Sequence, residues 1–289
     1  MGDAGRPKTS ELELLSEVAS EDVLEQRLHV GPDVACLEGH FPGFPVLPGI
    51  AQLHRVMRLG ERLLGQPVVP TRIDALKFRE VIQPGEEFVA RVELAREKSL
   101  LRFRIDREGR TAGSGRLVLS PAEEPLGVVA ADTTAASSLE GGELVPQSGA
   151  MLALGDVLAT DEKRTVCAVR AEGLPFFRAE DGSLPGWAGL EPMAQCIAAH
   201  GGLYAPPPPD GGTRVGFLLG CRRLQVRAAR LDASTAYAVA ADRIWGATTG
   251  LVSFDCELFE VSSGRRLLAG RINAYLPEDL SAVMEGRLE

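Results

Sequence analysis

Hydrophobic and polar positions alternate with a period of two along most of the chain, and two longer stretches depart from this pattern. Alternation over about four to eight residues predicts half-buried β-strands. In the first half it predicts strands at residues 23–30, 34–37, 73–78, 87–95, 100–105 and 113–119. Residues 49–64 instead carry apolar side chains at helical spacing, with Pro48 before them and Pro67 after them, and they predict an α-helix.

The same order of elements recurs in the second half. Strands are predicted at residues 151–158, 165–170, 215–226, 236–241, 251–260 and 266–275, and a helix is predicted at residues 187–203. This repeat indicates two domains of one architecture. Both helices carry apolar residues on most of their faces, so we expect each to be wrapped by a sheet. The expected fold class is α+β, with two tandem domains that each fold an antiparallel sheet around a central helix.

Chain length and local composition place the domain boundaries. A length of 289 residues is long for one core and favours two domains. We expect a polar tail at residues 1–17, a first domain at 18–120 and a second domain at 146–289. Residues 121–145, rich in Ala, Thr, Ser and Gly without periodicity, are expected to form a flexible linker.

Charge and cysteine usage exclude several function classes. The net charge of -9 argues against general nucleic-acid binding, which needs a basic surface. The sequence shows no apolar run near the roughly 18 residues that suggest a membrane span, and its N-terminus lacks an apolar signal core. The five cysteines are scattered without a Cys-x-x-Cys pair, which favours reduced thiols over disulfides or a metal site. We therefore expect a cytoplasmic protein that binds neither nucleic acid nor membrane nor metal.

Residues 39–49, Gly-His-Phe-Pro-Gly-Phe-Pro-Val-Leu-Pro-Gly, are the strongest candidate for chemistry. Three prolines restrict this loop, which leads from His40 into the start of the predicted helix. The first free N–H groups of that helix, at Gly49 and Ile50, can hydrogen-bond an oxygen on which negative charge develops. A histidine base beside such a helix end suits removal of a proton next to a thioester carbonyl. The simpler alternative is that His40 only satisfies a hydrogen bond in the core.

The same loop closely resembles the His-Phe-Pro…Pro-Val-x-Pro-Gly signature of the bacterial 3-hydroxyacyl-[acyl-carrier-protein] dehydratases. Residues 77–87 also resemble that family, and the resemblance covers about residues 20–120. The second half is similar to one dehydratase partner of aryl-polyene pathways at residues 185–200, 215–223 and 271–277, and residues 47–54 are similar to the other partner. The resemblance implies hot-dog domains, a dimer as the minimal unit, and active sites at the interface between two protomers.

The spacing of two residues shows where this chain departs from the family. In the family, a carboxylate on the central helix lies fourteen residues after the loop histidine and completes a site whose histidine belongs to the other protomer. Fourteen residues after His40 stands His54, and fourteen residues before Glu191 stands Phe177. Each half therefore keeps one member of the pair. If the halves pack as a pseudo-dimer, His40 and Glu191 form one complete site, and the mirror site with Phe177 and His54 is expected to be inactive in this chemistry.

The resemblance implies a role for each site residue. His40 would remove the C2 proton of the thioester, and Glu191 would orient and then protonate the departing 3-hydroxyl. For this Glu191 needs a pKa raised by burial, whereas the alternative is that it only complements the helix dipole. Gly49 is the candidate oxyanion donor, with Gly186 as the alternative. The substrate-binding candidates are Phe41, Pro42, Phe44, Pro48, Gly186, Trp187 and Gln195. A structural hydrogen bond is the simpler account for Gln195, as core packing is for Phe44 and Trp187.

The expected function is the dehydration of 3-hydroxyacyl thioesters on acyl-carrier protein to trans-2-enoyl thioesters, in fatty-acid, polyketide or aryl-polyene biosynthesis. No cofactor is expected beyond the phosphopantetheine of the carrier protein, and a homodimer of pseudo-dimers is a possible assembly. One alternative is a hot-dog acyl thioesterase, which activates water with a helix carboxylate and does not need the His-Phe-Pro loop. Another is a non-catalytic acyl-binding subunit of a larger complex, motivated by the missing partners at positions 54 and 177.

Overall fold

The computed structural model describes residues 12–41, 43–121, 124–129, 139–170, 172–205, 214–246 and 250–277. The first half contains β1 (Glu13–Ala19), β2 (Val23–His29), η1 (Ala35–Leu37), α1 (Gly49–Leu64), β3 (Arg72–Phe78), β4 (Glu87–Ala95), η2 (Arg96–Lys98), β5 (Leu100–Arg107) and β6 (Arg110–Val118), where η denotes a short 3-10 helix. The second half contains η3 (Gly141–Glu143), η4 (Gly149–Met151), β7 (Leu154–Thr160), β8 (Arg164–Val169), η5 (Pro175–Phe177), β9 (Leu184–Pro185), η6 (Gly186–Gly189), α2 (Leu190–Tyr204), β10 (Phe217–Val226), β11 (Arg230–Leu231), β12 (Tyr237–Gly246), β13 (Gly250–Glu260) and β14 (Arg266–Leu276).

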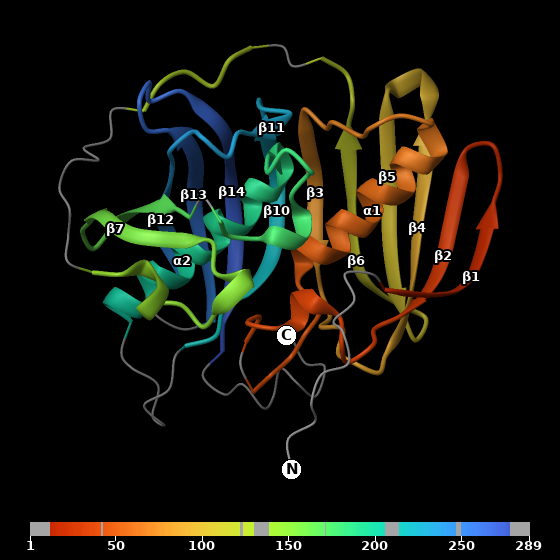
Figure 1. The fold of residues 1–289 in the computed structure, drawn as a ribbon, viewed down its shortest axis with the longest axis horizontal. Helices are drawn as coiled ribbons and strands as arrows, with labels where there is room; N and C mark the ends of the chain where they lie inside the picture. Colours follow the sequence, from red (N-terminus) through yellow and green to blue (C-terminus); the bar gives the residue numbers. More distant parts are fainter. Residues whose placement is uncertain are drawn as a thin grey trace.

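Both halves contribute to one 12-stranded antiparallel sheet, in the order β1-β2-β4-β5-β6-β3-β10-β14-β13-β12-β8-β7 (Figure 1). Equivalent strands follow in the same order from either end, so the halves are related by an internal pseudo-two-fold axis. At the centre β3 and β10 pair antiparallel, with Lys77 opposite Gly220 and Ile73 opposite Leu224. The chain is therefore two tandem hot-dog domains packed as a pseudo-dimer, as expected.

Helix α1 crosses one face of the first half of the sheet and packs on β4, β2 and β5 (Figure 1). Its apolar side, including Ile50, Leu53 and Met57, is buried against these strands. Gly60 allows a close approach, because a Cβ there would lie 2.7 Å from Cδ1 of Leu101 on β5. The helix has the expected length, and its packing brings its N-terminus to the boundary between the halves.

Helix α2 occupies the equivalent position in the second half, against β12, β8 and β13. Nine of its 15 residues are buried, which fits the expectation of a helix wrapped by its sheet. Buried apolar residues of both halves form one continuous cluster. The two domains therefore share a core, and this burial fixes the position of one helix relative to the other.

Three local predictions were wrong. Residues 34–37 form no strand, because Ala35–Leu37 is a 3-10 turn, and a short buried apolar run does not distinguish the two by its periodicity. The helix predicted from residue 187 begins instead as the 3-10 helix η6, and α2 starts at Leu190. The polar tail is wrong for residues 13–17, which belong to the edge strand β1. All seven residues of β1 are exposed, so no alternation of burial marks it in the sequence. Residues 1–11 of that tail lie outside the described residues.

The predicted linker is described only in part, since residues 122–123 and 130–138 lie outside the described residues. Val128 forms a β-bridge with Arg265, and Glu140 forms one with Asp156 of β7. Val145 is buried. The prediction of a flexible linker therefore fails for residues 139–145, because burial of isolated apolar side chains holds this stretch against the second domain.

Two further observations concern predictions made from composition. The five cysteines are free thiols with buried side chains. Within the described ranges, neither α-helix combines the length and the apolar character that crossing a lipid bilayer requires.

Candidate active site

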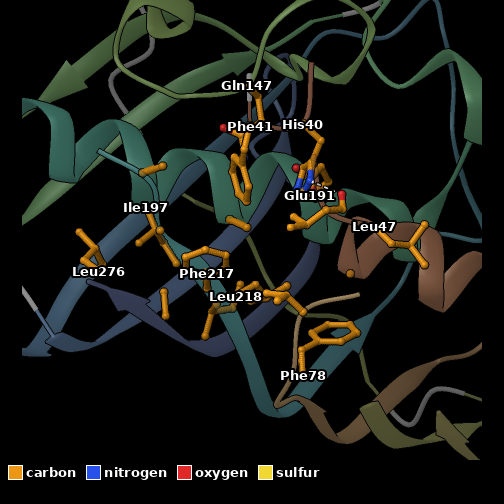
Figure 2. A pocket seen from close by; sticks show the side chains of 18 of the residues that line it. His40, Phe41, Leu47, Phe78, Gln147, Glu191, Ile197, Phe217, Leu218 and Leu276 are labelled. Atoms are coloured by element: carbon orange, nitrogen blue, oxygen red, sulfur yellow. Dashed lines mark hydrogen bonds between the residues drawn. The ribbon is translucent and has the colours of Figure 1, made fainter. Parts of the chain in front are cut away.

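An open cavity of about 950 Å³ lies where the two halves meet. The first half contributes His40, Phe41, Gly49 and Phe78 to its walls, and the second half contributes Glu191, Ile197 and Phe217 (Figure 2). The structure thus brings the two residues predicted for acid–base chemistry, His40 and Glu191, into one cavity.

His40 is buried and holds a defined tautomer. Its Nδ1 lies 3.0 Å from the backbone oxygen of Val46. A carbonyl oxygen only accepts hydrogen bonds, so Nδ1 carries the proton and Nε2 keeps its lone pair. Burial lowers the pKa of His40 to about 4, so the ring is neutral at pH 7. His40 therefore satisfies a core hydrogen bond through one nitrogen and is left in the protonation state of a general base at the other.

The loop that carries His40 is anchored to the second half of the chain. The N–H of Ser148 donates to the backbone oxygen of Gly39 at 2.9 Å. Gly39 has a φ of +79°, and a Cβ there would lie 2.0 Å from the oxygen of Ser148. Any larger residue would clash with that carbonyl. Gly39 thus lets the loop approach the second domain, next to the residue whose ring enters the cavity.

Glu191 is the second residue of α2 and is 6% exposed. Desolvation raises the pKa of Glu191 to about 7, while a hydrogen bond from Gln195 acts in the opposite direction. A carboxyl group with this pKa keeps its proton on a large fraction of molecules at neutral pH, as a general acid needs. Helix-dipole complementation alone does not explain this residue, since a buried carboxyl that stays protonated is not an anion.

Gln195 holds Glu191 in place from the next turn of α2. Its Nε2 donates to Glu191 Oε1 at 2.9 Å and to the backbone oxygen of Met151 at 2.8 Å, and its Oε1 accepts from the N–H of Ala153 at 2.8 Å. The side chain is buried and is not part of the cavity wall. The predicted substrate contact of Gln195 is therefore not seen, and the simpler structural account fits its hydrogen bonds.

The two glycines proposed as oxyanion donors differ in position. Gly49 lines the cavity at the N-terminus of α1, where first-turn N–H groups are not used by the helix. The N–H of Gly186 donates to the backbone oxygen of Ala229 at 2.9 Å, and a Cβ at Gly186 would lie 1.8 Å from the oxygen of Ala228. This geometry contradicts the predicted substrate contact of Gly186 and its alternative role as donor, because its N–H is already paired with the segment just before β11.

The remaining substrate-binding candidates separate into two groups. Phe41 lines the cavity, stacked on His40 with ring centroids 4.1 Å apart, and it meets Phe217 edge-on at 5.7 Å. Phe44 is 37% exposed and Pro48 is buried at the start of α1, and neither belongs to the cavity wall. Their predicted substrate contact is not seen, because the loop turns Phe44 toward solvent and uses Pro48 to start the helix. Pro42 lies outside the described residues.

The mirror position is filled by aromatic side chains. His54 and Phe177 lie edge-on, with ring centroids 5.4 Å apart, and Trp187 stacks on His54 at 6.0 Å. Trp187 is thus part of this cluster and not of the cavity wall, which corrects its predicted substrate contact. Burial, together with Arg58 and Arg55, lowers the pKa of His54 to about 4. The structure brings His54 and Phe177 together as the spacing predicted.

Sequence reasoning assigned no chemistry to two cavity residues, Gln52 and Gln147. The side-chain oxygen of each is buried without a hydrogen-bond partner among the described residues, and both residues line the cavity. Figure 2 shows Gln147 at the same end of the cavity as Phe41 and His40. Gln147 comes just after the predicted linker and belongs to no recognisable motif. The only sequence signal for Gln52 is that it is a polar residue on the buried face of the predicted helix.

Each half of the chain matches a family of known dehydratases. The family of ApeP dehydratases matches residues 139–285, which are 147 of the 289 residues, and the family of ApeI dehydratases matches residues 16–116. The chain is also similar to the 3-hydroxyacyl-[acyl-carrier-protein] dehydratase FabZ of Lawsonia intracellularis, with 32% identity over 71 residues, which are 21% of this chain and 46% of the relative. The chain spans about half the length of this relative and of the FabZ of Natranaerobius thermophilus.

Solved structures resemble nearly the whole chain. The dehydratase domain of a mycocerosic acid synthase-like polyketide synthase has a TM-score of 0.63 and 18% identity, over 95% of this chain and 100% of that one. The dehydratase domain of RzxB from Pseudomonas fluorescens has a TM-score of 0.66 and 15% identity, over 91% of this chain and 98% of that one. At these identities the likeness shows the fold. The family match over more than half of the chain shows that this protein belongs to the ApeP-like dehydratases.

Proposed function

We propose that this protein removes water from 3-hydroxyacyl thioesters carried on acyl-carrier protein and releases trans-2-enoyl thioesters. The observation that carries the proposal is that His40 and Glu191, one from each half, line one cavity. Burial gives them complementary protonation states at pH 7, because the pKa of His40 is lowered to about 4 and the pKa of Glu191 is raised to about 7. Two groups whose environments move their pKa values in opposite directions are typical of an acid–base pair.

The proposed reaction uses each group once. The lone pair on Nε2 of His40 takes the proton from C2, and the electrons of the broken C–H bond form the C2–C3 double bond. The C3–O bond breaks as protonated Glu191 gives its proton to the departing oxygen, which leaves as water. His40 is then protonated and Glu191 ionised, and transfer of a proton from the first to the second restores the starting state. Each proton-transfer group contributes about 10²–10⁴ in rate in reactions of this kind.

The start of α1 supplies the electrostatic part of the mechanism. Negative charge develops on the thioester oxygen as C2 loses its proton, and the helix N-terminus at Gly49 places N–H donors and the positive end of the dipole at the cavity. Loss of one such donor costs about 10²–10³ in kcat in related acyl chemistry. The rings of Phe41, Phe78 and Phe217 form apolar walls for the acyl chain.

The thioester would arrive on the phosphopantetheine arm of an acyl-carrier protein, as the name of the FabZ relatives states for those enzymes. The unpaired oxygens of Gln52 and Gln147 are suited to accept hydrogen bonds from the substrate hydroxyl or from the amide N–H groups of the arm. No further cofactor enters the proposed reaction. We further propose that the reaction serves fatty-acid, polyketide or aryl-polyene synthesis. A pairing of two chains into a larger assembly is also part of the proposal.

The test is incubation of the purified protein with a (3R)-3-hydroxyacyl-carrier protein, followed by mass spectrometry of the intact carrier protein. Loss of one water, dependent on His40, is the expected result. Release of the acyl group as a free acid would show a thioesterase instead, and an unchanged carrier protein would show a non-catalytic acyl-binding subunit. His40→Ala is the control, because contaminating dehydratase activity would survive this substitution.

A further inference from the structure

A second, smaller cavity of about 330 Å³ adjoins the one that contains His40 and Glu191. The two cavities share Ile197 and Leu276 as wall residues. Figure 2 shows both side chains on the side of the first cavity away from Leu47. The second cavity therefore borders the proposed acyl site at these two residues.

Helix α2 gives the length of this path. It places Glu191 in the first cavity and His200 in the second. At a rise of about 1.5 Å per residue, these two positions lie about 13 Å apart along the helix axis. An extended chain advances about 3.3–3.6 Å over three bonds, so the path takes roughly eleven bonds of an acyl chain.

His200 is held rigidly at the far end. It is 3% exposed, and its Nδ1 lies 2.9 Å from Oγ1 of Thr165. That hydroxyl lies 2.9 Å from Oγ1 of Thr160, which is 3.1 Å from the hydroxyl of Tyr204. The ring also contacts Tyr204 and Phe254, with centroids 4.8 Å and 5.3 Å away. This network fixes the direction in which the other ring nitrogen points.

The other nitrogen, Nε2 of His200, is buried and has no hydrogen-bond partner among the described residues. Buried polar atoms are nearly always paired, so this atom, on a residue that lines the cavity, calls for a partner that a ligand group or a water would supply. The other walls of the cavity are mostly apolar, with Ile197, Val252, Phe254 and Leu276. A mostly apolar cavity that also carries Arg243, Tyr204 and a fixed, unpaired ring nitrogen suits an apolar chain with a polar end.

We propose that the second cavity binds the distal end of the acyl chain and that His200 Nε2 pairs there with a hydroxyl group on that end. The inference rests on the proposed acyl-thioester function and adds a substrate class to it. A hydroxyl both donates and accepts, so it pairs with either tautomer of the ring. Burial lowers the pKa of His200 to about 4, so the ring is neutral and offers no charge to an anion. His200 is thus a specificity-determining residue, far from the reacting atoms.

A carboxylate at the chain end is the rival occupant, because Arg243 also lines this cavity. A hydroxyl is favoured because it brings no charge into apolar walls, where an ion is costly to place. The two occupants are distinguished by experiment, since they require different partners. A hydroxyl needs His200, whereas a carboxylate needs Arg243.

The test uses three 3-hydroxyacyl-carrier proteins of equal chain length, with roughly eleven bonds beyond C3, that end in a methyl, a hydroxyl or a carboxylate group. The wild-type protein should favour the hydroxyl-ended substrate over the methyl-ended one by about tenfold or more in kcat/KM. His200→Asn keeps a polar atom near Thr165 but removes the group at the Nε2 position, and it should abolish this preference, so that kcat/KM becomes about equal for the hydroxyl-ended and methyl-ended substrates. His200→Gln, whose amide reaches the Nε2 position, should retain part of it. His54→Asn, the same substitution on α1, is the matched control and should keep the full preference.

Binding of non-reactive amide analogues of the three substrates, measured by calorimetry, separates this inference from the proposed reaction. A hydroxyl preference in binding without any dehydration would contradict the reaction and support the subsite. Dehydration with equal kcat/KM for methyl and hydroxyl ends, or with a preference for the carboxylate end, would overturn the subsite and leave the reaction standing. A hydroxyl preference that survives in His200→Asn would also overturn it.

Discussion

The ring of His54 lies edge-on against the ring of Phe177, with the planes at 88° and the centroids 5.4 Å apart. The pseudo-two-fold relation of the halves makes this pair the counterpart of Glu191 and His40. The second copy of the site thus holds an aromatic cluster, with neither a carboxyl group at position 54 nor an imidazole at position 177. His54→Phe should therefore leave kcat/KM within about twofold of wild type, a change of about 0.4 kcal/mol in the activation free energy. A large loss in steady-state assays would show that the second position takes part in the chemistry.

The pH dependence of activity follows from the two buried groups. His40 must be neutral and has a pKa of about 4, so activity is lost as pH falls through 4. Glu191 must be protonated and has a pKa of about 7, so activity is lost as pH rises through 7. We expect a bell-shaped profile of kcat/KM with limbs near these values. A profile that rises from pH 6 to pH 9 would reverse the assignment of acid and base.

Gln195 should set the upper limb of that profile. Its hydrogen bond to Glu191 lowers the pKa of that carboxyl, so Gln195→Leu should move the upper limb to higher pH. The variant should also lose activity, because Glu191 is no longer oriented. It should lose about 1–3 kcal/mol of folding stability for each buried backbone group left unpaired, the oxygen of Met151 and the N–H of Ala153. If the variant loses stability but the upper limb of the pH profile does not move, Gln195 has only a structural role.

Glu191 should make the folded protein less stable at alkaline pH. Its pKa is about 7 in the folded protein against an ordinary 4.5, so the folded state favours the protonated form. The free energy of unfolding therefore falls as pH rises from 4.5 to 7 and stays low above that. Glu191→Gln should be more stable than wild type at pH 8, by up to about 3 kcal/mol, and nearly equal to it at pH 4. Denaturant unfolding at both pH values measures this, and equal stability at pH 8 would contradict burial of the carboxyl group.

Gly39 should be more sensitive to substitution than Gly43 in the same loop. Both have positive φ, +79° and +85°, but only at Gly39 would a Cβ meet another atom within 4 Å, the oxygen of Ser148. Gly43→Ala should cost about 1–2 kcal/mol from backbone strain alone. Gly39→Ala should cost about 2–4 kcal/mol, because the contact with the second half is added to that strain. Equal losses in thermal unfolding would argue that the loop does not pack on Ser148.

The sequence was most informative where a physical rule links spacing to structure. The helix at residues 49–64 was predicted with its observed bounds, because Pro48 and the apolar spacing mark its start and face. The edge strand β1 was missed because all its residues are exposed. Its sequence therefore lacks the alternation of apolar and polar residues that marks a half-buried strand. The division of His40 and Glu191 between the halves followed from counting along a resemblance. Which atoms surround them depended on packing between the domains.

The parts of the site that the sequence did not reveal are those made by distant segments. Gln147 lines the cavity because the chain after the linker packs against the loop at Gly39. Gly186 has an ordinary helix-start context, yet its N–H donates to the backbone oxygen of Ala229, in the bend just before β11. The second cavity exists because Leu276 on β14 meets the face of α2 that carries Ile197. None of these contacts has a local signal, since each depends on the register of the completed sheet.

The central claim, that one chain makes one site from both halves, is tested most directly by mixing two inactive variants. His40→Ala and Glu191→Ala should each reduce kcat for dehydration of a 3-hydroxyacyl-carrier protein by about 10²–10⁴. The double variant should be little worse than either, because the two groups act as a unit. If the site lies within one chain, an equimolar mixture of the single variants, unfolded and refolded together, stays as inactive as its components. Recovery of activity in the mixture would show that His40 and Glu191 meet across chains, and would contradict this account.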